Sequence, residues 1–195
     1  HYQGEDGTMN YSELNREKRE TNLLRSTVYW AADLAAVAVL AVFVVLFFCD
    51  RVTVTGHSME PVLAADDVVL VNRVQYHFSD PERYDIIVFT KENGSGTKTY
   101  VKRVIGLPGE TVQIMNETVY IDGVPLEEET LAHVSLSGLA DEPVVLGENE
   151  YFVLGDNRDS SEDSRFAGIG NVKRSQIIGR VWFRIGPFEN LGSIR

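Results

Sequence analysis

Cysteine is nearly absent from this chain of 195 residues, and basic residues are scarce. The single cysteine, Cys49, excludes an internal disulfide and leaves a thiolate metal site without a second cysteine. The chain has 18 lysines and arginines and 29 aspartates and glutamates. The resulting net charge of −11 disfavours binding to nucleic acid and to anionic lipid. Only four histidines are present, so few can serve as catalytic bases. We expect no cofactor and no metal.

One long hydrophobic run is present, from Val28 to Cys49, and Asp33 is its only charged residue. As a helix the run would span ~33 Å, enough for a hydrocarbon layer of ~30 Å. Its apolar residues cover all sides and no cleavage site follows, so we interpret it as a transmembrane helix rather than a core helix or a signal peptide. Basic residues precede the run, whereas only one follows it closely, which predicts a cytoplasmic amino terminus. The preceding ones are Arg16, Lys18, Arg19 and Arg25, and the following one is Arg51.

We therefore expect three parts along the chain. Residues 1–27 are a polar cytoplasmic leader, residues 28–49 the transmembrane helix, and residues 50–195 one catalytic or binding domain outside the cytoplasm. Because the chain begins with His1 rather than methionine, Met9 is the candidate natural start.

Short runs of β-branched and aromatic residues follow the hydrophobic segment, separated by turn formers such as Asp122-Gly123. They predict strands at residues 68–71, 85–89, 100–105, 111–114, 119–121, 151–154 and 178–185. Asn116-Glu117-Thr118 matches a glycosylation acceptor but is interpreted as a hairpin turn. A short helix is expected near residues 127–132, and the acidic stretch 127–150 is expected to be a surface excursion. The sequence thus predicts a mainly β domain built from antiparallel strands.

Ser58 lies in Gly56-His57-Ser58-Met59-Glu60-Pro61, shortly after the hydrophobic run. A serine hydroxyl needs a base within hydrogen-bond reach to become a nucleophile. His57 would point to the opposite face of a strand, and His77 and His133 lack companion motifs, so a Ser-His-Asp arrangement is disfavoured. The segment also lacks the second glycine of a Gly-x-Ser-x-Gly elbow.

Lys102 is the better candidate base, because it lies between apolar residues of a predicted strand. It shares one face with Tyr100 and Val104, while Arg103 lies on the other face. A desolvated lysine has a lowered pKa, and its neutral amine can accept the proton of Ser58. A lysine in a strand is more often solvated or at an edge, so this spacing alone leaves both interpretations open.

Two further motifs are weaker. Ser95-Gly96-Thr97-Lys98 matches Ser-x-x-Lys of penicillin-binding enzymes, but it lies in a glycine-rich linker without the accompanying motifs. The carboxylates between Gly155 and Arg165 could suggest calcium, but their order lacks the glycine and glutamate spacing of an EF-hand.

Four segments resemble, in the same order, the motifs of bacterial type I signal peptidases, which are membrane-anchored serine proteases. They are spread along most of the predicted β domain, at residues 58–61, 83–89, 100–110 and 155–165. The resemblance implies an antiparallel β-sheet domain of the signal-peptidase type, with Ser58 as nucleophile and Lys102 as general base.

The resemblance also assigns supporting roles. Ser161 matches a serine whose hydroxyl hydrogen-bonds the lysine amine. Asp163 with Arg165, and Asp156 with Arg103, match ion pairs that brace the site. Gly56 stands where some members carry a serine that stabilises the oxyanion, so backbone N–H groups at Ser58 and near Gly56 are expected to do so here.

The implied activity is the removal of signal peptides from exported preproteins through an acyl-enzyme. The expected partners are signal peptides with an Ala-x-Ala pattern, bound as an added β-strand, together with the lipid bilayer and the export machinery. The residues from Asp50 to Ser58 span at most ~28 Å, which keeps the serine near the membrane. Two alternatives are a membrane-tethered β domain that binds without catalysis and a self-cleaving Ser-Lys protease of the repressor type. The second is disfavoured by the anchor and by the lack of a DNA-binding module.

Overall fold

The computed structural model describes residues 11–94, 96–127 and 134–194 of the chain. Contacts divide the chain into two compact units, His1–Phe47 and Phe48–Arg195. Each unit has its own architecture, and the functional residues proposed from the sequence all lie in the second.

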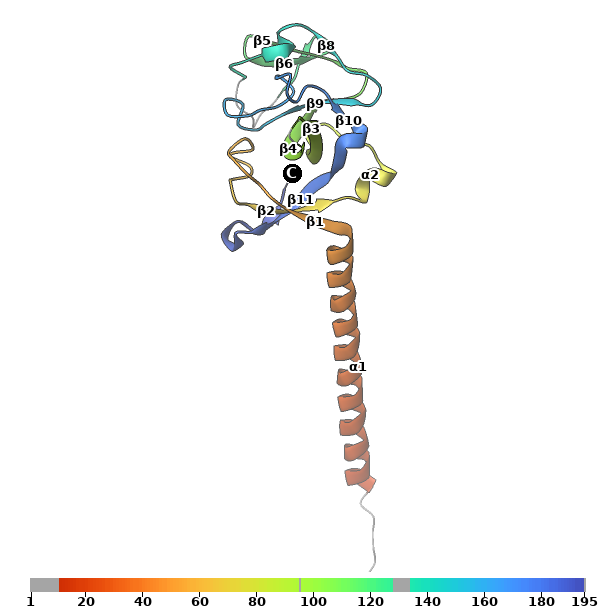
Figure 1. Cartoon of the computed structure of the whole chain (residues 1–195). Coiled ribbons are helices and arrows are strands. Elements are labelled where there is room, and N and C mark those ends of the chain that lie inside the picture. The colour runs from red at the N-terminus through yellow and green to blue at the C-terminus, as the bar shows by residue number, and fades with distance from the viewer. Residues whose placement is uncertain (1–10, 95, 128–133, 195) are drawn as a thin grey trace, which may run out of the picture. The chain divides into compact units, whose positions relative to one another are not determined.

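The first unit contains one continuous helix, α1 (Tyr11–Phe48), shown in red and orange in Figure 1. Within it, Arg25–Phe43 has a mean hydropathy of 1.7 and unburied side chains, so it meets the length and composition of a membrane span. The helix begins at Tyr11, so the polar leader residues from Tyr11 onward are helical as well. The predicted end at Cys49 is wrong by one residue, because Cys49 begins strand β1.

The second unit is built on two antiparallel sheets, which confirms the predicted mainly β class. The larger sheet has the order β1-β2-β11-β3-β4-β9-β10, with β12 paired to β11, and the smaller has the order β7-β6-β5-β8. The smaller sheet forms a separate layer, seen around β5, β6 and β8 in Figure 1. Short helical segments connect some strands: α2 (Gln75–Phe78), η1 (Gly138–Asp141), η2 (Arg174–Gln176) and η3 (Phe188–Asn190).

The strand bounds are as follows. In the larger sheet they are β1 (Cys49–Thr53), β2 (Val68–Asn72), β3 (Ile86–Asn93), β4 (Gly96–Gly106), β9 (Glu150–Leu154), β10 (Val172–Lys173), β11 (Ile177–Gly186) and β12 (Gly192–Ser193). In the smaller sheet they are β5 (Thr111–Met115), β6 (Thr118–Ile121), β7 (Val124–Pro125) and β8 (Val144–Val145). All seven predicted strands are present, and β1 is the longest strand that the sequence patterns missed.

Three apolar clusters form the core of the domain. One packs the smaller sheet against β9, and the other two lie against the larger sheet. The acidic stretch 127–150 takes part in the first cluster through Val134, Ala140 and Leu146, all buried. The prediction of a purely surface excursion is therefore wrong for this stretch, because isolated apolar residues within it reach the core. The predicted helix near residues 127–132 lies outside the described residues apart from Glu127.

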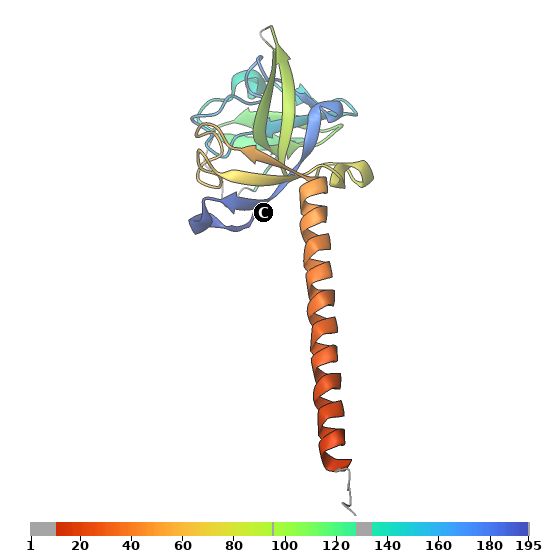
Figure 2. The same cartoon turned by 60° about the horizontal axis from the view of Figure 1, so that its bottom comes forward.

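The sequence predicted the turn of one hairpin but not the full length of another. Asn116 and Glu117 join β5 to β6 with positive φ angles of 49° and 64°, which confirms the predicted hairpin turn. Strands β3 and β4 form a long hairpin paired from Ile86 with Arg103 to Asn93 with Gly96 (Figure 2). Gly96–Lys98 therefore belongs to a strand, not to the linker that its glycine content suggested.

The far half of β4 is paired on one side only. Strand β3 pairs along its whole length, whereas β9 pairs only with Arg103, Val104 and Gly106. Strand β1 likewise pairs with β2 and ends the sheet. Two strand edges in this domain thus keep free backbone groups of the kind that can bind an added strand.

Gly179 allows β2 and β11 to approach, and it generates a prediction on stability. A Cβ atom there would collide with the backbone carbonyl of Asn72, which cannot move away without disturbing the sheet. Gly179→Ala should lower the free energy of unfolding by about 1–3 kcal/mol. Thermal or denaturant unfolding measures this, with Gly192→Ala as the control, because a Cβ at Gly192 meets open space. Equal stability of the two variants would contradict the tight approach.

Candidate active site

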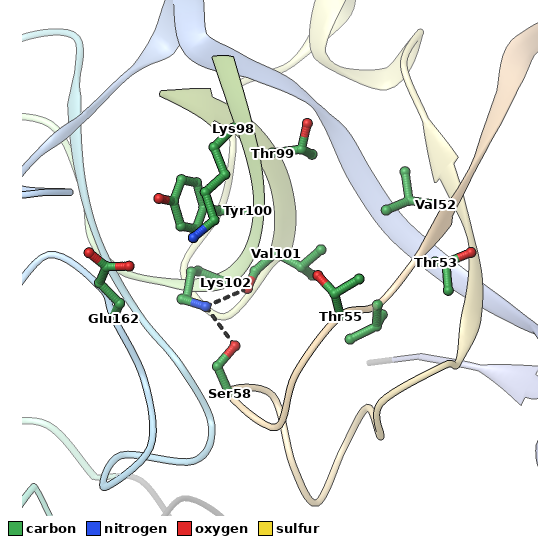
Figure 3. A pocket seen from close by; sticks show the side chains of 11 residues that line it. Val52, Thr53, Thr55, Ser58, Lys98, Thr99, Tyr100, Val101, Lys102 and Glu162 are labelled. Atoms are coloured by element: carbon green, nitrogen blue, oxygen red, sulfur yellow. Dashed lines mark hydrogen bonds between the residues drawn. The ribbon is translucent and has the colours of Figure 1, made fainter. Parts of the chain in front are cut away.

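A pocket of about 360 Å³ lies between residues 52–55 and the free half of β4. Ser58 and Lys102 line it together, although they are 44 positions apart in the sequence. Figure 3 shows their side chains pointing toward one another at its floor. The pocket therefore joins the two residues that the sequence singled out independently.

A tight turn carries Ser58 into the pocket. Gly56 begins it with a φ of 80°, a conformation that favours glycine. The turn is anchored directly after the serine, because Met59 and Leu63 are fully buried and the N–H of Leu63 donates to the carbonyl of Met59 at 2.8 Å. The N–H of Asn157 donates to the Ser58 carbonyl at 3.1 Å. These contacts fix the backbone from which the Ser58 hydroxyl projects.

The Lys102 amine lies 2.7 Å from Ser58 Oγ, within hydrogen-bonding distance. Its Nζ also donates to the carbonyl of Val101 at 3.1 Å, and the residue is only 4% exposed. Burial lowers the pKa of Lys102 from 10.5 to about 8. The nearby carboxylates of Asp163, Glu162 and Asp156 oppose this effect but do not cancel it. A substantial fraction of Lys102 is therefore neutral at mildly alkaline pH and able to accept a proton.

Two buried ion pairs lie behind the pocket. Arg103 binds Asp156 through Nε and Nη2, both contacts at 2.7 Å. Arg165 binds Asp163 in the same forked manner at 2.8 and 2.9 Å, and it also donates to the carbonyl of Arg158 at 2.6 Å. Forked Arg–carboxylate contacts fix both partners in orientation, so they hold the loop 155–165 in one conformation against β4.

Ser161 lies close to the Ser58 backbone but does not make the hydrogen bond that the resemblance implied. It is buried, and among the described residues its Oγ has no hydrogen-bond partner. The Lys102 amine is directed to Ser58 and to the Val101 carbonyl instead. The implied hydrogen bond between Ser161 and Lys102 is therefore absent among the described residues.

The described histidines do not line the pocket that contains Ser58 and Lys102. His57 is exposed and its Nδ1 lies 2.7 Å from Glu60, which raises its pKa by hydrogen bonding and charge. His77 contacts the carbonyl of Arg73 through its ring, and His133 lies outside the described residues. Within the described part of the chain, no histidine lines the pocket. A serine–lysine pair is the arrangement that this geometry offers.

Comparison with known proteins places the chain in a family. The model of the family "Signal peptidase, peptidase S26" matches residues 27–186. The chain belongs to this family. A signal peptidase I of Bacillus amyloliquefaciens is 37% identical over 186 residues, covering 91% of this chain and 98% of that protein. One of Leptolyngbya laminosa is 40% identical over 162 residues, covering 80% of this chain and 78% of its own length.

A crystal structure of a signal peptidase I from Enterococcus faecalis is also similar, with 36% identity and a TM-score of 0.44. The match covers 52% of this chain and 97% of that one. The family assignment confirms the resemblance to bacterial type I signal peptidases that the four motifs suggested, and it makes the chain a peptidase of a membrane-associated family.

The pocket of this signal peptidase also contains residues that sequence reasoning missed. Lys98 and Tyr100 line it from β4, and Glu162 lines it from the loop 155–165. A signal for the first two was present, because residues two and four places before Lys102 share its face on a strand. Glu162 follows Ser161 directly, but the sequence does not indicate which way its side chain turns.

Gly155 positions the loop against the nucleophile, and this can be tested. A Cβ atom there would collide with the Ser58 carbonyl and with the Ser161 hydroxyl. Gly155→Ala should displace Ser58 and lower kcat about 10²-fold with a smaller change in KM, because the chemistry depends on the alignment of the two side chains. Gly147→Ala is the control, since its Cβ would make only ordinary contacts at 3.5 Å. Unchanged kcat in Gly155→Ala would show that the close approach has no catalytic role.

Proposed function

We propose that this chain is a membrane-anchored serine endopeptidase that removes N-terminal signal peptides from exported preproteins with a Ser58/Lys102 dyad. The family assignment supports the removal of signal peptides. The observation that carries the dyad is the 2.7 Å separation of Lys102 Nζ and Ser58 Oγ, together with the burial that lowers the pKa of Lys102.

The reaction follows from that contact. The neutral amine of Lys102 takes the proton of Ser58 as the serine oxygen attacks the scissile carbonyl, and a tetrahedral intermediate forms. The Lys102 ammonium then gives this proton to the leaving amine, the C–N bond breaks, and the acyl-enzyme remains. Lys102 next deprotonates a water that attacks the ester, and the proton returns to Ser58 as the signal peptide leaves.

Backbone N–H groups are the proposed stabilisers of the oxyanion. The structure describes no hydrogen bond donated by the N–H of Gly56 or of Ser58, so both groups remain able to bind a ligand. The positive φ of Gly56 gives the turn before Ser58 its sharp bend. A preorganised donor of this kind typically contributes ~2.7–4 kcal/mol to transition-state stabilisation.

The substrate is proposed to bind as an added strand. Residues 52–55, at and just after the end of the edge strand β1, face across the pocket the half of β4 that is paired on one side only. An extended peptide between them would gain main-chain hydrogen bonds from both sides. Ser58 and Lys102 stand at one end of this gap, where such a peptide would present its scissile bond.

The anchor is proposed to hold the enzyme beside its substrates. Arg25–Phe43 has the composition of a membrane span, and the basic residues before it favour an amino terminus in the cytoplasm. The catalytic domain would then lie on the outer side of the cell membrane, where the export machinery delivers preproteins. Signal peptides and the lipid bilayer are the proposed partners, and the net charge of −11 disfavours nucleic acid.

Removing either member of the dyad tests the assignment. Ser58→Ala and Lys102→Ala should each lower preprotein cleavage by at least about 10³-fold, because they abolish the nucleophile or its base. Lys102→Arg should be equally inactive, since guanidinium stays protonated. Cleavage in detergent, followed by gel electrophoresis, measures these losses. Ser160→Ala is the control, because this exposed serine lies outside the pocket. Full cleavage by Ser58→Ala or Lys102→Arg would refute the dyad.

The pH dependence of cleavage tests the state of the base. The folded pKa of Lys102 is lowered to about 8, so its reactive neutral form is the minor form below this pH and dominates above it. The value of kcat/KM should therefore rise about tenfold per pH unit in the acidic limb and level off above a pH of about 8. A rise that continued to the ordinary lysine value of 10.5 would contradict the lowered pKa.

A further inference from the structure

The pocket has two unlike faces, because side chains alternate along β4. Val101 lies on one face and packs, with Val52, against the buried cluster that contains Val54 and Met59. Lys98, Tyr100 and Lys102 lie on the opposite face, and Figure 3 shows Glu162 on that same side. The first face is closed by packed apolar groups, whereas the second carries charge.

A peptide strand added beside β4 would meet both faces in turn. A substrate side chain opposite Val101 points to the closed face, where it meets the packed apolar side chains of Val101 and Val52. Its neighbour in the peptide points to the face of Tyr100, where the side chains of Lys98 and Glu162 are exposed. In the Ala-x-Ala pattern expected of the substrate, the small residues one and three places before the cut would point to the closed face. The residue between them, two places before the cut, therefore faces the charged side.

Glu162 is placed to contact that middle residue. Its carboxylate has no hydrogen-bond or ion-pair partner among the residues that the structure describes. It extends beside Gly168, whose missing Cβ leaves the space, since a Cβ there would lie 3.1 Å from Oε1. Glu162 also follows Ser161 directly in the loop that contacts the Ser58 carbonyl through Asn157. An unpaired carboxylate thus lines the pocket close to the reacting end.

Lys98 provides a charge of opposite sign at the other end of the same face. Its ammonium lies 4.9 Å from the centre of the Tyr100 ring, which holds it in place by a cation–π contact. Four residues along a strand separate the backbones of Lys98 and Lys102 by about 13 Å. Glu162 outweighs Lys98 in its electrostatic effect on the Lys102 amine, in keeping with a position nearer the dyad.

We propose that Glu162 is a specificity-determining residue that makes this peptidase favour a basic over an acidic side chain two places before the cut. The preference rests on the proposed cleavage of signal peptides by Ser58 and Lys102. A lysine or arginine there pairs with the free carboxylate, whereas a glutamate is repelled by it. Both charges are exposed to solvent, so the expected preference is about threefold to tenfold and weakens with added salt.

Competition between peptides in one tube tests this proposal. Three signal-sequence peptides that differ only in lysine, glutamine or glutamate two places before the cut are incubated together with the full chain in detergent. Mass spectrometry gives the ratio of their kcat/KM values. Because all three share one enzyme at one pH, any effect of a variant on the pKa of Lys102 cancels in the ratio.

The two charged residues should change the ratio in opposite directions. Glu162→Gln should bring the lysine-to-glutamate ratio close to one, whereas Lys98→Gln should raise it above that of the unmodified chain, because Lys98 attracts glutamate and repels lysine. Equal cleavage of the three peptides by the unmodified chain would overturn the proposal, as would a preference that survives Glu162→Gln. Failure to cleave even the glutamine peptide would instead count against the proposed function on which this preference rests.

Discussion

The burial of the Lys102 amine against Ser58 is the contact on which the proposed chemistry of this protein depends. An amine in water holds its proton at neutral pH and cannot act as a base, whereas an amine with 4% exposure has its pKa lowered to about 8. Strand β4 achieves this by placing Lys102 between apolar neighbours with its Nζ directed at the serine. The same strand leaves its far half unpaired, so the edge that would bind the substrate runs directly to the base.

Opposing effects set the pKa of Lys102, the proposed base. Burial lowers the pKa of Lys102, while the carboxylates of Asp163 and Asp156 raise it. Each of those carboxylates is neutralised by a forked contact with a buried arginine, Arg165 or Arg103. Removing one arginine would leave an uncompensated buried charge near the amine, which is costly in folding energy and would return the lysine toward its protonated form. The ion pairs therefore couple the stability of the loop 155–165 to the state of the base.

Much of this arrangement could be predicted from the sequence. Runs of β-branched residues located the strands, and the shared face of Tyr100 and Lys102 followed from the period of a strand. Strand β1 was not predicted, because it directly follows the hydrophobic run and has charged residues in its middle. That Lys102 hydrogen-bonds Ser58 and not Ser161 depends on packing between distant segments. The turn of Glu162 into the pocket depends on the space at Gly168, which no local pattern records.

A direct titration tests whether burial gives Lys102 in the resting protein a pKa of about 8. Lysine side chains labelled with ¹³C next to the amine report protonation by NMR, and the Lys102→Met variant assigns the Lys102 signal by its loss. We expect this one signal to titrate with a pKa of about 8. Titration of Lys102 at the ordinary value of 10.5 would contradict it.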